Sequence, residues 1–292
     1  MLSKIVSSNF GFRRLIHLSS KANGVFQVQN NESTGVTTIR LENQKKKNAL
    51  SFDAMDEFGT LVRAAAKDPK CRALLWTGSG EVFCSGLDLA DFAEKSGCLD
   101  KSLSPEERKR RAETMSPKVE NMVGALIDFP KPLIAGVNGH AVGIGVTALA
   151  LCDYVIATNK ATFNAPFSHL GFVVEAASSF TFPLLLGPMI TMDMLVFGRV
   201  LKAEEAVEKG LLTKVVAPNH FEHDSQKVTE LAASFPKGAF AAGKERIRNC
   251  AGGMNREKLH KACREELVAI SKQWASDEVY TAVSNFLNRK KK

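Results

Sequence analysis

FCSGLDL, at Phe83–Leu89, and NGHAVGIG, at Asn138–Gly145, are the two stretches of this sequence that decide its fold. Each follows a short aliphatic run, Ala73–Thr77 in the first case and Leu133–Val137 in the second. A strand, a glycine turn and then a helix-like sequence leave backbone N–H groups unpaired and directed at a ligand. Two such groups that converge on one oxygen atom would form an oxyanion hole.

The sequence around these loops lacks the signatures of several other chemistries. It has no Gly-x-Ser-x-Gly nucleophile elbow, no His or Cys cluster with metal-ligand spacing, and no phosphate loop with its lysine. We therefore expect enolate stabilisation, with a carboxylate that moves the proton, and we expect neither a metal site nor a cofactor.

Strand-like and helix-like segments alternate along most of the chain. Strands are expected at Val36–Leu41, Ala73–Thr77, Leu133–Val137, Asp153–Ala157 and Leu212–Val216. Helices are expected from the cap residue Ser51 to Lys67, from Ser104 to Ile127, at Val146–Leu151, and repeatedly over residues 220–288. This order predicts crossover connections and a mostly parallel sheet. We expect an α/β core over residues 25–218 and a helical C-terminal region over residues 219–292.

Charge and hydropathy exclude some classes of partner. The net charge is +8, but residues 1–21 carry four basic and no acidic residues, and Arg289–Lys292 adds four more positive charges. The remainder is close to neutral, so no broad basic face and no nucleic-acid partner are expected. No apolar run reaches about 18 uncharged residues, the length that a membrane-spanning helix needs.

The N-terminal segment has the composition of a targeting peptide. Serines, aliphatic residues and the pair Arg13 and Arg14 precede the first acidic residue, Glu32. This pattern predicts a mitochondrial transit peptide over residues 1–21 and a location in the mitochondrial matrix. The alternatives are an N-terminus without a targeting role and a peroxisomal location, which the absence of a C-terminal Ser-Lys-Leu disfavours.

An ordered set of motifs resembles the crotonase, or enoyl-CoA hydratase/isomerase, superfamily over roughly residues 25–288. These motifs are Asn48–Leu50, Phe83–Leu89, Lys131–Gly145, Leu151–Asp153, Ala161–Phe163 and Ala203–Leu211. Within the superfamily, Pro166–Gly171, Glu175, Ser178–Pro183 and the segment from Trp274 to Leu287 are most similar to the Δ3,Δ2-enoyl-CoA isomerase branch.

The resemblance implies a crotonase-like spiral of ββα units with a helical C-terminal trimerisation region. It implies a homotrimer or a dimer of trimers that binds acyl-CoA, with coenzyme A as part of the substrate. The thioester oxygen would be held by the backbone N–H groups of Ser85 and Ile144. The other substrate-binding residues implied are Gly86, Leu87, Asp88, Leu89, Gly143, Lys46 and Ala49.

Departures from the superfamily pattern bear on the reaction. Hydratases use two glutamates, and the matching positions here hold Thr147 and Phe167, which cannot activate water. Glu175 stands where the isomerase branch has its single catalytic carboxylate, among apolar neighbours. Burial among such neighbours raises the pKa of an acid and strengthens it as a base once ionised. Glu175 is therefore the catalytic candidate.

Three functional hypotheses follow from these residues. The first is a Δ3,Δ2-enoyl-CoA isomerase, which shifts a 3-enoyl double bond to the trans-2 position in the β-oxidation of unsaturated fatty acids. The second is another crotonase reaction, dienoyl-CoA isomerisation or acyl-CoA hydrolysis. The third is a non-catalytic acyl-CoA-binding module, because chromodomain-linked proteins of the same branch keep the fold without the activity. Lys45–Lys47 is either a solvated charge run or a contact for the phosphates of coenzyme A.

Overall fold

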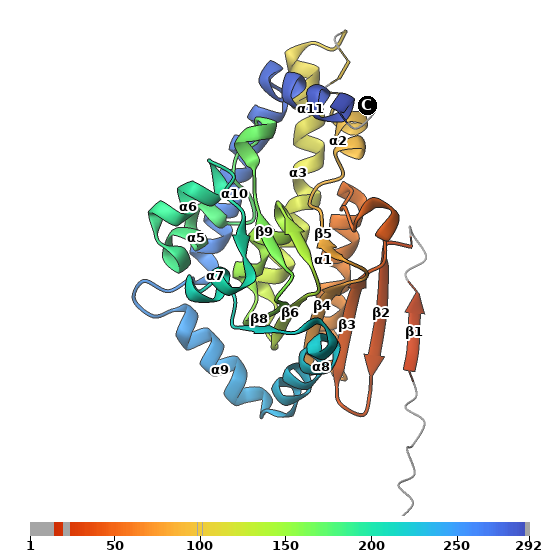
Figure 1. Cartoon of the computed structure of the whole chain (residues 1–292), viewed down its shortest axis with the longest axis vertical. Coiled ribbons are helices and arrows are strands. Elements are labelled where there is room, and N and C mark those ends of the chain that lie inside the picture. Colours follow the sequence, from red (N-terminus) through yellow and green to blue (C-terminus); the bar gives the residue numbers. More distant parts are fainter. Residues whose placement is uncertain (1–14, 20–23, 98, 101, 290–292) are drawn as a thin grey trace, which may run out of the picture.

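The computed structural model describes residues 15–19 and 24–289, except for residues 98 and 101. Of the segment predicted as a transit peptide, only Leu15–Ser19 falls in this part, as a strand; the rest lies outside the described residues. The described strands form two sheets with helices packed around them (Figure 1).

The larger sheet has seven strands in the order β1-β2-β3-β4-β6-β8-β11. Their bounds are β1 Leu15–Ser19, β2 Phe26–Asn31, β3 Val36–Leu41, β4 Ala73–Gly78, β6 Leu133–Val137, β8 Tyr154–Thr158 and β11 Lys214–Val216. Strands β1, β2 and β3 pair antiparallel, whereas every pairing from β3 to β11 is parallel. The prediction of a mostly parallel sheet is confirmed.

The smaller sheet has four strands in the order β10-β9-β7-β5. Their bounds are β5 Val82–Cys84, β7 His140–Val142, β9 Thr162–Asn164 and β10 Leu201–Lys202. The sequence did not indicate this sheet, because strands of two or three residues are too short to show an alternating pattern.

One order of elements, a long strand, a short strand and a helical segment, recurs three times. It is β4-β5-α2, β6-β7-α4 and β8-β9-η3, with α2 at Leu89–Ser96, α4 at Ile144–Thr147 and the 3₁₀ helix η3 at Phe167–Leu170. The α/β fold with ββα units is thereby confirmed. The helix expected at Val146–Leu151 is instead α4 followed by a 3₁₀ helix, η2, at Ala148–Leu151, because the helical backbone already begins after Gly143.

Two long helices, α1 at Phe52–Lys67 and α3 at Pro105–Asp128, pack together beside the larger sheet. The hydroxyl of Ser51 accepts a hydrogen bond from the Ala54 N–H at 3.1 Å, which is the predicted N-terminal cap of α1. Phe58 of α1 packs against Trp76 of β4 with ring centroids 5.0 Å apart. This contact anchors α1 on the strand that leads into the first glycine loop.

The helices after α4 complete the fold. They are α5 Ser178–Leu186, α6 Pro188–Leu195, α7 Ala203–Glu208, α8 Pro218–Ser234, α9 Lys237–Arg248, α10 Arg256–Trp274 and α11 Asp277–Arg289; a 3₁₀ turn, η1, lies at Gln44–Lys46. Helix α8 covers strands of the larger sheet and α10 packs on α3. Helix α11 lies against α2 and η3, at the upper end of the molecule in Figure 1. The C-terminal region is helical, as expected, and it packs on the core.

Candidate active site

The first glycine loop joins β5 to α2 and is fixed by a bridge to the segment before α1. The N–H of Leu50 donates to the carbonyl of Gly86 at 2.8 Å, and the N–H of Asp88 donates to the carbonyl of Leu50 at 2.9 Å. In such a parallel bridge the residue between the two bonds, Leu87, directs its own N–H away from the partner. In the described residues that N–H has no hydrogen-bond partner.

The second glycine loop joins β7 to α4. Gly143 is the residue before the helix and has a φ of +55° with a ψ of −124°, which a residue with a side chain rarely adopts. Ile144 is the first helical residue, so its N–H lacks a partner within the helix. A side chain on Gly86 would begin 2.9 Å from the Val142 carbonyl oxygen and 3.7 Å from the Cα of Gly143. The two loops therefore approach each other at their glycines.

The backbone N–H of Ser85 cannot act as the oxyanion-hole donor that the resemblance implied. Its N–H already donates to the carbonyl of Lys47 at 3.1 Å, so it is not free to hold a thioester oxygen. The expectation for the Ser85 N–H is contradicted, and the unpaired donor of this loop belongs to Leu87, two residues further on. The reason is the backbone at Gly86, whose φ of +82° breaks the strand-like alternation, so the Ser85 N–H turns to Lys47 while the Leu87 N–H turns away from Leu50.

Glu175 lies between η3 and α5, beside both loops. Its Oε1 atom is 4.0 Å from the position that a Cβ atom on Gly143 would take. Burial of the carboxyl raises the pKa of Glu175 to about 8, and the negative charge of Glu266 adds to the rise. No hydrogen bond or ion pair to this carboxyl is found among the described residues. Glu175 is therefore a half-buried acid that can exchange a proton near neutral pH.

A cavity of about 1050 Å³ opens in front of these groups. Its lining includes five residues predicted to bind substrate, together with Glu175; the five are Ser85, Gly86, Leu87, Leu89 and Gly143. The structure thus brings both glycine loops and the candidate acid to one site. This volume is slightly above the usual range of small-molecule and cofactor sites, which is about 300–1,000 Å³.

One wall of the cavity is aromatic. Phe172, which lines it, stacks edge to face on Phe92 of α2 with ring centroids 5.2 Å apart. Phe92 in turn packs against Trp274 at the end of α10, at 5.3 Å. Phe92 is fully buried and Trp274 is 4% exposed, so this wall is a rigid apolar surface suited to a hydrocarbon chain.

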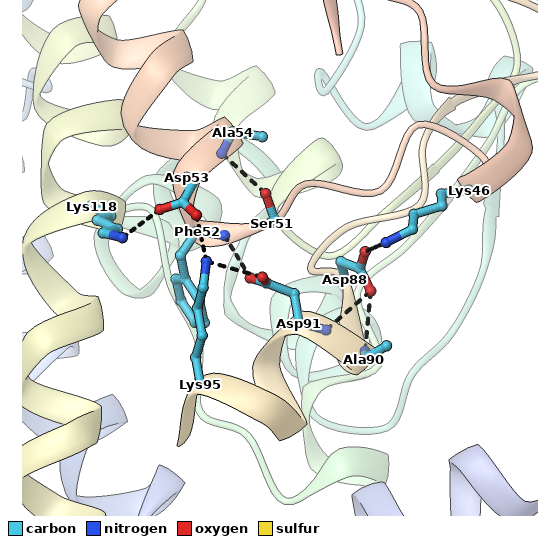
Figure 2. Close-up of polar contacts among 10 residues, drawn as sticks. All are labelled: Lys46, Ser51, Phe52, Asp53, Ala54, Asp88, Ala90, Asp91, Lys95 and Lys118. Carbon is cyan, nitrogen blue, oxygen red and sulfur yellow. Dashed lines mark hydrogen bonds and ion pairs between the residues drawn. The ribbon is translucent and has the colours of Figure 1, made fainter. Parts of the chain in front are cut away.

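Four residues predicted to contact substrate do not line the cavity: Ile144, which is fully buried, and Lys46, Ala49 and Asp88. Figure 2 shows the Lys46 Nζ atom bonded to Asp88 Oδ2 at 2.7 Å, at the start of α2. Asp88 caps this helix by accepting from the N–H groups of Ala90 and Asp91. Burial alone would raise the pKa of Asp88, but the bonds from Lys46 and the backbone lower it overall. Lys46 and Asp88 therefore fix the first glycine loop from outside the cavity.

The two positions that carry glutamate in hydratases are apolar or neutral in this site. Thr147 is fully buried in α4, and its hydroxyl donates to the Gly143 carbonyl at 3.4 Å. Phe167 is 6% exposed and lines the cavity. Neither side chain can act as a base toward water.

Sequence reasoning missed some of the site. Helix α11 contributes Asp277, Glu278, Thr281, Ala282, Asn285 and Phe286 to the cavity. It also missed Glu266 of α10, which is 6% exposed and contacts the segment after Glu175. The helical spacing of Leu259, Cys263, Glu266 and Ile270 places this acid on the buried face of α10, which was the available signal.

The arrangement offers one half-buried acid, two backbone N–H groups without a partner among the described residues, and an apolar wall. A carboxyl with a pKa of about 8 can take and return a proton, and the N–H groups can stabilise an oxyanion nearby. Among the described residues there is no group of three or more His, Cys, Asp or Glu side chains placed to hold a metal ion. In the same part of the chain, no helix is both long enough and apolar enough to cross a bilayer.

Comparison with known proteins agrees with this geometry. The model of the family described as enoyl-CoA hydratase/isomerase matches residues 31–292. The chain belongs to the enoyl-CoA hydratase/isomerase family. A crystal structure of an enoyl-CoA hydratase/isomerase from Pseudoalteromonas atlantica is 30% identical, with a TM-score of 0.78 over 91% of this chain and 97% of that one.

Several curated members of the family are similar to 88% of this chain. Enoyl-CoA delta isomerase 2 of Homo sapiens is 40% identical, and the chain spans 62% of its length. Peroxisomal enoyl-CoA delta isomerase 3 of Mus musculus is 34% identical, with 77% of its length covered. Chromodomain Y-like protein of Rattus norvegicus is 33% identical, with 41% covered. The family thus includes relatives named as isomerases and relatives named for a chromodomain.

Proposed function

We propose that this protein is a Δ3,Δ2-enoyl-CoA isomerase that moves a 3-enoyl-CoA double bond to the trans-2 position. The observation that carries the proposal is Glu175, a carboxyl in the cavity with no hydrogen-bond partner in the described residues, beside the two glycine loops. The names of the relatives at 40% and 34% identity support the same reaction.

The reaction needs one base and one oxyanion site. With the thioester oxygen between the N–H groups of Leu87 and Ile144, the protons at C2 of a 3-enoyl chain become acidic. Ionised Glu175 takes one of them, and the charge spreads over a dienolate from the thioester oxygen to C4. Protonated Glu175 then returns the proton at C4, which leaves the double bond between C2 and C3. C2 and C4 are close along the chain, so one carboxyl on one face serves both steps.

The alternatives need groups that this site lacks or does not use. Hydration requires a pair of acids around a water molecule, and Thr147 and Phe167 occupy the matching positions. Dienoyl-CoA isomerisation needs a second proton carrier. Two further acids, Asp277 and Glu278 at the start of α11, line the cavity. Asp277 is paired with Arg108, and Glu278 accepts a hydrogen bond from Gln273. A binding module without activity would not need an acid in the place of Glu175.

The test is an isomerase assay on the purified chain with a 3-enoyl-CoA, following the ultraviolet absorbance of the conjugated 2-enoyl thioester. Because the base must be ionised, the rate should rise with pH and level off above about 8. Glu175→Gln should lower turnover by about 10²–10⁴. Glu278→Gln, which removes another acid of the cavity, should lower it by less than about tenfold. Parent protein that binds acyl-CoA but isomerises nothing would leave the binding-module hypothesis in its place.

We propose a mitochondrial matrix location on the basis of the acid-free, arginine-bearing start of the chain. A reporter fused to residues 1–30 should enter mitochondria, and a cytosolic or peroxisomal reporter would refute the proposal.

We also propose that the chain forms a homotrimer or a dimer of trimers. Large apolar side chains are exposed along α5, α6 and the segment that follows, including Met189 at 78% and Phe197 at 72%. Such a patch indicates a protein interface. Light scattering should give three or six times the mass of one chain, and a monomer would contradict it.

A further inference from the structure

The segment after Glu175 has an unusual backbone. Ala176 and Ala177 have φ values of +59° and +58°, although neither is glycine. Two consecutive residues in the left-handed region are disfavoured by about 1–3 kcal/mol each and persist only where the surroundings hold them. This turn directs the Glu175 side chain towards the glycine loops, and it leads directly into α5.

One side chain holds this turn in place. Glu266, in the middle of α10, accepts a hydrogen bond from the Ala177 N–H at 2.7 Å with Oε2. Its other oxygen, Oε1, accepts from the Ser179 N–H at 2.8 Å. Glu266 is 6% exposed, so both bonds are shielded from water. A carboxylate that accepts from two N–H groups at the start of a helix is well satisfied in its ionised form.

We propose that Glu266 is a positioning residue for the reaction, which locks the turn after Glu175 and keeps a second negative charge beside it. The inference rests on the proposed function in that Glu175 is taken as the proton carrier. Burial raises the pKa of Glu175, and the negative charge of Glu266 adds to this rise. A stronger base at the same position takes the weakly acidic C2 proton more readily.

The other groups that face this pair do not supply a compensating charge. The thiol of Cys84, on β5 beside Glu175, has its pKa raised to about 12 by burial. The thiol of Cys263, one turn before Glu266 on α10, also has its pKa raised to about 12, by burial and then by Glu266. Both thiols stay neutral at physiological pH. The charges of Glu120 on α3 and Arg264 on α10 act on Cys263 and have opposite signs.

Two substitutions separate the charge of Glu266 from its positioning. Glu266→Gln removes the charge and keeps one of the two hydrogen bonds, because an amide has a single acceptor oxygen. The acid limb of the pH-rate profile should therefore move to lower pH by roughly half a unit or more. Glu266→Asp keeps the charge but is one methylene too short to reach both N–H groups. In Glu266→Asp the acid limb of the pH-rate profile should stay at the same pH, while turnover on the plateau falls about tenfold or more. Glu265→Gln, on the exposed face of the same helix, removes an equal charge and is the matched control.

A second measurement does not depend on activity. Carbon-13 labelling of the glutamate carboxyls gives the titration of each acid without substrate, with Glu175 assigned by its loss in Glu175→Gln. Because Glu266 is ionised while Glu175 titrates, its charge acts on Glu175, so Glu175 should titrate at lower pH in Glu266→Gln than in the parent. If the parent protein fails to isomerise 3-enoyl-CoA, the proposed function is wrong, but this titration still decides the role of Glu266.

The inference has clear contrary results. It is overturned if Glu266→Gln lowers thermal stability without moving the acid limb, because that is the behaviour of a purely structural residue. It is equally overturned if Glu175 titrates at the same pH in the parent and in Glu266→Gln.

Discussion

Glu175→Gln should make the protein more stable at alkaline pH, although most substitutions at buried positions destabilise. The pKa of Glu175 is about 8 in the fold, against 4.5 in an unfolded chain. Below pH 4.5 the group is protonated in both states and has no effect. Between the two values the unfolded chain ionises while the fold keeps the proton, so the stability of the parent falls as pH rises and reaches its full loss above about 8.

The size of this effect follows from the difference between the two pKa values. At about 1.36 kcal/mol per pH unit, the gap between 4.5 and about 8 corresponds to about 5 kcal/mol. This is an upper limit, because Glu175 is half-buried and water in the cavity screens its charge. We expect Glu175→Gln to raise the free energy of unfolding by about 2–3 kcal/mol at pH 9 and by less than about 0.5 kcal/mol near pH 4.5.

Urea unfolding of both proteins at several pH values, at one fixed protein concentration, measures this difference. Glu265→Gln, whose side chain is 69% exposed, is the control and should differ from the parent by less than about 0.5 kcal/mol throughout. A Glu175→Gln difference that is independent of pH, or that decreases as pH rises, would refute the assignment of Glu175 as a neutral acid in the folded protein.

Two further predictions concern the loops. Gly86→Val and Gly143→Val should each lower turnover about 10²–10³-fold in folded protein, because the first meets the Val142 carbonyl and the second cannot keep a φ of +55°. Gly252→Val, with a φ of +80° and no atom within 4 Å of its Cβ position, is the control for strain alone and should retain most of the turnover. Lys46→Ala should weaken acyl-CoA binding roughly tenfold at low salt and less at high salt if Lys46 meets a CoA phosphate; unchanged binding would contradict that contact.

The sequence predicted those features that local chemistry determines. The cap at Ser51 and the strands before the two glycine loops follow from short motifs and spacing. The place of Glu175 beside these loops was implied by the resemblance to the isomerase branch. The donor at Ser85 was predicted wrongly, because the outward-facing N–H depends on pairing with Leu50, which lies far away in the sequence. Glu266 was missed for the same reason, since its partners are 87 and 89 residues away.

The contrast between Glu175 and Glu266 separates the two roles that a buried acid can have. Both lie in an apolar interior, and burial raises the pKa of each. The pKa of Glu266 stays above its ordinary value because of burial, but two backbone N–H groups offset part of this rise and favour its ionised form. Glu175 receives none in the described structure and faces the cavity. Neighbouring acids whose surroundings push their pKa values apart are the usual sign of divided roles. The satisfied acid can hold its charge while the other changes protonation, so a single base can work here without a second proton carrier.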